Sequence, residues 1–289
     1  MSEVAFFVKL HGLPYRSHPE VCFELTMPGS AQIIRRIIVS ATCKGGVGRT
    51  FFLVNLADWY AEIEQDFAFF DSDIYNGTLT RFLPDSRFLP LDNPEEAVRE
   101  LSEVLDESEV IGWDALGALK GYYPDFLDET FVQNKDRFTE HRVTMILMIE
   151  EDKDTVFQAG ELAKRLGDQV DWLVVKNHKT CSTSEIYDNS KARQELLRLG
   201  AVEITMERVP WSLLATIQKT SRGLSSLVLD ESLPFLERQR LRTFQKRFFE
   251  QLESARALLV PTRLAMTAPV HKSGKPTSSA RPRVAPEEV

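Results

Sequence analysis

Residues 43–50 read CKGGVGRT, and they lie between an apolar run, RRIIVSA (35–41), and the segment FFLVNLADWYAEIE (51–64). The apolar run is typical of a buried strand, and the segment after the turn has apolar side chains at helical spacing. A glycine-rich turn can curl so that several backbone N–H groups point inward, and the helix that begins near Arg49 adds its N-terminal dipole. Such a turn attracts anionic phosphate. The stretch therefore predicts a phosphate-binding turn between a strand and a helix.

The turn meets the general pattern GxxxxGK[ST] only in part. Cys43 replaces the first glycine and Arg49 replaces the lysine, whereas Thr50 supplies the hydroxyl that holds Mg²⁺ in this pattern. The pentapeptide KGGVG (44–48) is more specific, because at average residue usage it occurs by chance about once in a few thousand chains of this length.

The alternation of strand and helix continues to about residue 206. Between alternating parallel strands the chain needs right-handed crossover helices, which cover both faces of the sheet. We therefore predict a doubly wound, mostly parallel α/β sheet of the phosphate-loop (P-loop) NTPase type. Further strands are expected at 67–70, 110–113, 143–149, 171–177 and 202–206, and further helices at 93–107, 125–140, 154–167 and 184–199.

Composition divides the chain of 289 residues into three parts. Residues 1–30 form an N-terminal appendage, residues 31–260 the α/β domain, and residues 261–289 a tail rich in Pro, Ser, Lys and Arg that we expect to be disordered. The tail has five basic and two acidic side chains and is +3, so the rest of the chain, whose total is −8, carries −11. A body this acidic excludes a general nucleic-acid coat, so any polyanion must bind locally.

Several other classes of protein are excluded. The three cysteines, Cys22, Cys43 and Cys181, form no CxxC pair, which excludes a disulfide scaffold and a four-cysteine metal site within one chain. The five histidines show no ligand spacing, and no serine lies in a GxSxG turn. Without a membrane-length apolar run or a signal peptide, we expect a cytoplasmic protein.

The loop KGGVGRT resembles the KGGVGKT loop of the ParA/MinD family, whose first lysine marks a "deviant" Walker A motif. The resemblance covers roughly residues 35–225 and implies that ATP and Mg²⁺ bind at this loop. Lys44 would reach the ATP of the partner subunit in a homodimer, and Arg49 would stand for the lysine that contacts the β- and γ-phosphates. Loop residues expected to contact the nucleotide are Lys44, Gly45, Gly46, Val47, Gly48, Arg49, Thr50 and Phe51.

Carboxylates follow two of the expected strands, at the sheet edge where the phosphate loop lies. Asp71 and Asp73 match the family's DxD, so that Asp73 would position the attacking water and Asp71 would be a Mg²⁺ partner. Asp114 matches the Walker B aspartate and would bind Mg²⁺, although Leu116 and Gly117 depart from the DxPxG that follows it in the family. Capping of strand ends is the alternative role of these acids.

The base of the nucleotide is expected at two further strand ends. Asn177 matches an asparagine that reads adenine in the family, and Val209-Pro210 matches a hydrophobic-proline pair beside the base, where Trp211 could stack. The ordinary structural roles are a turn for Asn177, a strand end for Pro210 and core packing for Trp211.

A last helix is expected between Pro234 and about Leu259. It has an apolar stripe of Leu241, Phe244, Phe248, Leu252 and Ala255, and its first half is basic. The stripe indicates packing on the sheet. The basic side chains are either simply solvated or bind non-specific DNA, as in ParA-like proteins; because a long polar tail follows, we favour DNA or a protein partner over a membrane. These side chains are Arg238, Arg240, Arg242, Lys246 and Arg247.

The function that the resemblance implies is a slow ATPase, with Lys44, Asp73 and Arg49 as catalytic residues. It would act as a dimerising switch in plasmid or DNA partition, or in positioning a cellular assembly. The alternative is a non-hydrolysing nucleotide-binding scaffold of a plasmid transfer or secretion complex, which Arg49 favours. A transport or metal-insertion chaperone is a third reading, and the missing CxxC argues against it.

Overall fold

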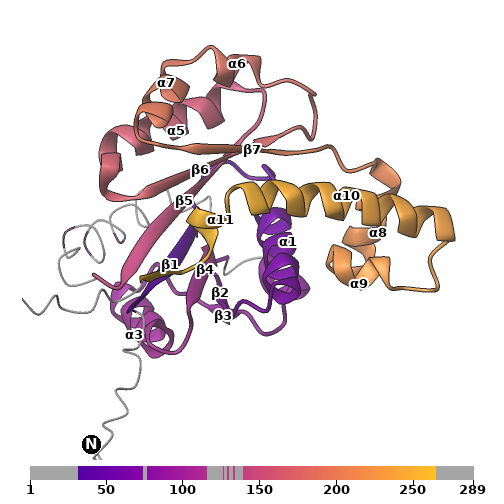
Figure 1. The fold of residues 1–289 in the computed structure, drawn as a ribbon, viewed down its shortest axis with the longest axis horizontal. Helices are drawn as coiled ribbons and strands as arrows, with labels where there is room; N and C mark the ends of the chain where they lie inside the picture. Colours follow the sequence, from indigo (N-terminus) through magenta and orange to yellow (C-terminus); the bar gives the residue numbers. More distant parts are fainter. Residues whose placement is uncertain are drawn as a thin grey trace, which may run out of the picture. The chain divides into compact units, whose positions relative to one another are not determined.

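A sheet with the strand order β3-β2-β4-β1-β5-β6-β7 forms the centre of the protein, with β8 added to β1 (Figure 1). The computed structural model describes residues 32–73, 77–115, 126, 129, 133 and 139–264. The pairs within the central order are parallel, and β8 is antiparallel to β1. The predicted doubly wound, mostly parallel fold is therefore confirmed. The strands are β1 (Gln32–Ser40), β2 (Ala68–Asp71), β3 (Arg87–Phe88), β4 (Val110–Asp114), β5 (His141–Ile149), β6 (Asp171–Asn177), β7 (Val202–Met206) and β8 (Thr262–Leu264).

Successive residues of a strand point to opposite faces of the sheet. Because buried strands carry apolar side chains on both faces, helices cover both faces of the sheet. Ile37 and Val39 of β1 join the core under α3, α5 and α7, whereas Ile38 joins the core under α1 and α8–α11. The described helices are α1 (Arg49–Glu62), α2 (Thr78–Phe82), α3 (Pro94–Leu105), α5 (Lys153–Leu166), α6 (Glu185–Asp188), α7 (Lys191–Arg198), α8 (Trp211–Thr220), α9 (Leu224–Val228), α10 (Phe235–Ser254) and α11 (Arg256–Leu259).

Register brings the strand ends that carry polar residues to one edge. Asp114 pairs with Ser40 of β1 on one side and with Asp71 of β2 on the other. Asn177 of β6 pairs with Met206 of β7. The polar groups that the sequence places far apart therefore meet at the carboxyl edge of the sheet, around the turn that follows β1.

The predicted helix over residues 184–199 is interrupted. The structure has α6 and α7 instead, because Ser190 leaves the helix and its side chain caps α7 by accepting a hydrogen bond from the Arg193 N–H at 3.0 Å. Serine competes with the backbone in this way and favours helix starts over helix interiors. By contrast, α3 begins as expected, with Asn93 as cap and Pro94 at its first position.

The predicted last helix is present as α10, followed by the short α11. Its stripe is buried: Leu241, Phe244, Phe248 and Leu252 pack against α1 and the sheet. Within the described part of the chain, no helix is both long and apolar enough to cross a membrane.

Several predicted segments differ from the structure or lie outside the described residues. Residues 262–264, which composition assigned to the tail, form β8 and pair with Gln32–Ile34. The remaining tail, the appendage 1–30, most of the helix expected at 125–140, and Leu116 with Gly117 lie outside the described residues.

Candidate functional site

The turn after β1 has the backbone conformation that a phosphate cradle needs. Gly46 and Gly48 have φ of +76° and +92°, values that side-chain-bearing residues rarely adopt. A Cβ on Gly48 would lie 2.9 Å from the Asn177 amide nitrogen, so glycine is required there for space as well. Since α1 begins at Arg49, its free N–H groups and positive dipole end face the same turn.

Two side chains from the end of β6 hold this turn in place. The Asn177 Nδ2 donates to the Val47 carbonyl at 2.8 Å, and the Lys179 ammonium donates to the Gly46 carbonyl at 2.8 Å. The Asn177 Oδ1 accepts from the Lys179 backbone N–H at 3.1 Å. Asn177 was predicted at the site, but Lys179 was missed. Its position two residues beyond a polar strand end was the available signal.

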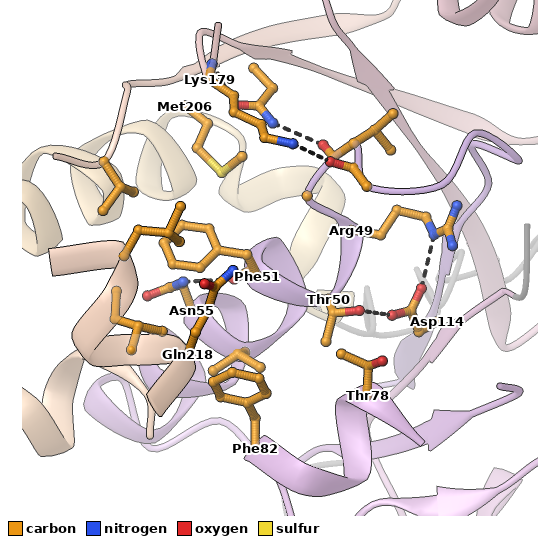
Figure 2. A pocket seen from close by; sticks show the side chains of 18 of the residues that line it. Arg49, Thr50, Phe51, Asn55, Thr78, Phe82, Asp114, Lys179, Met206 and Gln218 are labelled. Atoms are coloured by element: carbon orange, nitrogen blue, oxygen red, sulfur yellow. Dashed lines mark hydrogen bonds and ion pairs between the residues drawn. The ribbon is translucent and has the colours of Figure 1, made fainter. Parts of the chain in front are cut away.

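Asp114 is the centre of a buried polar group at the start of α1. Its Oδ2 accepts from the Thr50 hydroxyl at 2.5 Å, and its Oδ1 accepts from the Arg49 Nε at 3.1 Å (Figure 2). Burial raises the pKa of Asp114 above its ordinary value, and Arg49 and Thr50 oppose that rise. Two of the three predicted metal-site residues, Thr50 and Asp114, are thus brought into contact.

The Arg49 side chain donates to three groups of the protein. Besides Asp114, its Nη1 donates to the carbonyls of Thr42 and, at 3.1 Å, of Lys44. The guanidinium is therefore engaged within the protein, where it neutralises Asp114. A lysine has one ammonium and could not make these contacts together.

Lys44 also has a partner in its own subunit. Its Nζ lies 3.0 Å from the Asp152 carboxylate, which caps α5 by accepting from the backbone N–H groups of Asp154 and Thr155. Burial works against ionisation of Asp152, but these N–H donors and Lys44 together keep the pKa of Asp152 below its ordinary value. Asp152 was not predicted, because a cap position alone does not reveal a charge partner.

Asp71 and Asp73 have different surroundings. The buried Asp71 carboxylate accepts from the backbone N–H groups of Asp73 at 2.9 Å, Leu79 at 2.9 Å and Thr80 at 3.1 Å, so it ties the first turn of α2 to the end of β2. Asp73 is half-buried and lines the pocket beside the phosphate loop.

A pocket of about 1220 Å³ opens in front of the turn. At its β6–β7 side it is lined by Asn177, Met206, Val209 and Trp211, and Trp211 is 74% exposed. Pro210 stands immediately before α8 as its N-cap residue. The strand ends predicted to hold a base therefore meet the pocket that contains the phosphate loop.

The basic side chains of α10 are mostly exposed. Arg240, Arg242 and Lys246 face solvent, Arg247 pairs with Glu207 at 3.1 Å, and Arg238 is half-buried. The helix thus combines a packed stripe with a solvated basic face.

The residues present fit a nucleotide with Mg²⁺. The cradle supplies N–H groups for phosphate, and Thr50 with Asp114 offers two oxygen donors side by side. Among the described residues, no group of three or more His, Cys, Asp or Glu could hold a metal ion. Mg²⁺ commonly combines one or two protein oxygens with substrate phosphates and water, so a small donor set agrees with it.

The sheet order, the glycine turn after β1 and the Thr50–Asp114 pair together define a phosphate-loop α/β protein. No family model matches the chain. Over 71 residues the chain is 39% identical to the Fe-S cluster assembly factor HCF101, chloroplastic, of Arabidopsis thaliana; the match covers 24% of this chain and only 13% of that protein.

Solved structures similar to the chain include members of the family that its loop resembles. The MinD cell division protein of Aquifex aeolicus has a TM-score of 0.45 and 16% identity, covering 75% of this chain and 97% of that one. A ParA family ATPase from Chlorobium tepidum TLS has a TM-score of 0.47 and 10% identity, covering 75% and 98%.

Proposed function

We propose that the protein is a ParA/MinD-like nucleotide switch that binds ATP with Mg²⁺ at Lys44–Thr50. The observation that carries the proposal is the phosphate cradle itself, with Gly46 and Gly48 at positive φ directly before α1 and the Thr50–Asp114 pair beside it. The adjoining pocket is large enough for the rest of the nucleotide. Asn177 lines it on the proposed side of the base, where Pro210 stands between the lining residues Val209 and Trp211.

Each residue then has a role. Thr50 and Asp114, and Asp71 behind them, would hold Mg²⁺, which neutralises charge on the phosphates when bound. Asp73, on the pocket wall, would orient the attacking water. Lys44 would leave Asp152 and reach the nucleotide of a second subunit, so that ATP favours a homodimer.

Hydrolysis is proposed to be slow. Catalysis requires a cation placed where charge develops on the transferred phosphoryl group. Arg49 is instead held by Asp114 and by two backbone carbonyls. To act on the phosphates it would have to give up these contacts, so it supports binding more readily than turnover.

The output of the switch is proposed to be binding of DNA or a protein partner in the cytoplasm through the exposed basic face of α10. This would suit plasmid or DNA partition, or the positioning of a large assembly. The second candidate is a nucleotide-binding scaffold that does not hydrolyse ATP, and the contacts of Arg49 are the observation that favours it.

The test is a thermal-unfolding series with Mg-ATP and Mg-ADP, since a ligand that binds only the folded state raises the melting temperature. We expect a rise with either nucleotide, and no rise at millimolar concentrations would refute nucleotide binding. Sizing with a slowly hydrolysed ATP analogue tests the switch: the parent should dimerise and Lys44→Ala should stay monomeric while still binding nucleotide. Identical species for both would reject the role of Lys44.

A further inference from the structure

The side-chain amide of Asn55 on α1 is buried, and only one of its two polar atoms has a hydrogen-bond partner among the described residues. Asn55 is 1% exposed, and its Nδ2 donates to the Phe51 carbonyl at 2.6 Å. Its Oδ1 has no hydrogen-bond partner among the described residues. A buried acceptor without a donor loses its hydration and gains nothing in return, so such atoms are rare and indicate a missing partner.

Asn55 lines the same pocket as the phosphate loop but lies deeper along α1. It follows Thr50 by five residues, which is about 7.5 Å of helix rise. The pocket volume of about 1220 Å³ exceeds the roughly 300–1,000 Å³ that holds a typical small ligand. The pocket therefore has room beyond a nucleotide. Figure 2 shows Phe51, Asn55, Phe82 and Gln218 gathered on one side of Thr50, with Arg49 and Asp114 on the other.

We call this part the inner compartment, and its walls come from three helices. They are Phe51, Val54 and Asn55 of α1, Phe82 of α2, and Ile217 and Gln218 of α8. None of these side chains carries a charge, and Phe51 and Phe82 provide aromatic surface. Arg222, which also lines the pocket, is already paired with Asp230.

We propose that the inner compartment binds a compact, uncharged, apolar molecule that carries one N–H or O–H donor for the Asn55 Oδ1. Apolar walls with one well-placed polar group are what small-molecule sites commonly present. The Oδ1 atom is covered in the structure. Gln218, an exposed side chain of α8, is drawn beside Asn55 in Figure 2, and it would have to turn outward to admit the donor. The site does not depend on nucleotide binding.

The probe is indole, which has an aromatic body and one N–H donor, and its control is 1-methylindole, which lacks the donor. Both are titrated into ¹⁵N-labelled full-length protein without nucleotide, and the Asn55 side-chain amide signals are followed. These signals are assigned as the pair missing from Asn55→Leu. We expect saturable shifts with indole and about tenfold weaker binding of 1-methylindole, the ratio that corresponds to one hydrogen bond of about 1.4 kcal/mol.

The matched control variant is Asn189→Leu. Asn189 donates to the carbonyl four residues earlier, that of Glu185, at 2.9 Å, as Asn55 does to Phe51, but it is exposed and follows the last residue of α6. Asn189→Leu should keep the tenfold preference for indole, and Asn55→Leu should bind both probes equally. The proposal is overturned if indole causes no saturable shift up to its solubility, if the parent does not distinguish the probes, or if Asn55→Leu keeps the preference. The first two outcomes are read from all amide signals of the parent without assignment, so misfolding of Asn55→Leu cannot protect the proposal.

Discussion

At the scale of single residues, the site depends on two ion pairs. Arg49 neutralises Asp114, and Lys44 is held by Asp152 at 3.0 Å. The charges of Lys44 and Arg49 are thus neutralised by carboxylates of the protein without bound phosphate. The properties of the switch should therefore change when these pairs are altered.

Replacing Arg49 by lysine should raise ATP turnover several-fold. A lysine cannot make the forked contacts with Asp114 and the Thr42 and Lys44 carbonyls, so its ammonium is released toward the phosphates. Steady-state phosphate release measures the effect, and adding Asp73→Ala should erase the gain if Asp73 holds the water. A brisk parent enzyme that Arg49→Lys slows down would show that Arg49 is itself an adapted catalytic residue.

Gly48→Ala should destabilise the fold by about 1–3 kcal/mol, because it forces a side chain into a left-handed conformation. The Gly48→Ala variant should also weaken nucleotide binding, because the alanine Cβ would lie 2.9 Å from the Asn177 side-chain nitrogen. Gly45→Ala is the matched control, since a Cβ there has nothing within 4 Å. Denaturant unfolding and ATP titration compare the two. Equal effects of both variants would contradict the cradle geometry.

The Lys44–Asp152 pair should make stability depend on pH. The pKa of Asp152 is lowered in the folded protein, so its contribution is present above the ordinary carboxyl value of about 3.9 and is lost as the pH falls through the folded value. Asp152→Asn keeps an acceptor for the cap but removes the charge. Its melting temperature should lie below that of the parent at pH 7, and the difference should vanish at low pH. A difference that is constant with pH would assign the effect to capping alone.

At the scale of elements, α10 has two different faces: one packs on α1, and the other is basic and exposed. Phe244 and Phe248 pack against Phe51 and Phe52 of α1, with ring centroids 6.1 Å and 5.8 Å apart. The opposite face carries exposed arginines and lysine. Packing therefore accounts for the helix, and its basic face is available for a partner.

Changing Arg240, Arg242 and Lys246 to glutamine should weaken DNA binding and flatten its salt dependence, because fewer counterions are released. Stability should stay within about 0.5 kcal/mol of the parent, since these side chains are exposed. Fluorescence anisotropy with duplex DNA at several salt concentrations measures binding. An affinity that responds neither to salt nor to the variant would leave α10 with packing alone.

At the scale of the whole molecule, the C-terminal segment closes the amino edge of the sheet. Arg36, 5% exposed, pairs with Asp171 of β6 and donates to the carbonyls of Ala257 at 2.6 Å and Val260 at 3.3 Å. The Tyr60 hydroxyl donates to Leu259 at 2.6 Å. These long-range bonds fasten α11 and Val260 to β1 and α1, the two elements on either side of the phosphate loop.

Arg36→Met should cost about 3 kcal/mol of unfolding free energy, because it leaves the Asp171 carboxylate and two carbonyls without their buried donor. Arg142, 2.7 Å from Asp171, limits the loss. The control is Arg35→Met, whose more exposed pair with Glu140 should contribute no more than about 1 kcal/mol. Urea unfolding compares them. Similar losses in both variants would mean that Arg36 is not the anchor of the segment.

Periodicity and local chemistry alone predicted the fold. The apolar runs at 143–149 and 171–177 became β5 and β6, and the glycines of KGGVG became the turn before α1, because these signals are local in the chain. The meeting of Thr50 with Asp114 was also expected, since carboxyl ends of parallel strands share one edge.

Only the tertiary structure decided which partner each polar group takes. Arg49 is held by Asp114, Lys44 pairs with Asp152, and Lys179 donates to the Gly46 carbonyl. The Asn55 Oδ1 has no partner among the described residues. These arrangements depend on side chains that lie far apart in sequence or on the shape of the space between helices. Such contacts result from packing the helices on the sheet, and the pattern of residues along the chain does not predict them. The same holds for β8, three residues that become a strand because β1 offers them an open edge.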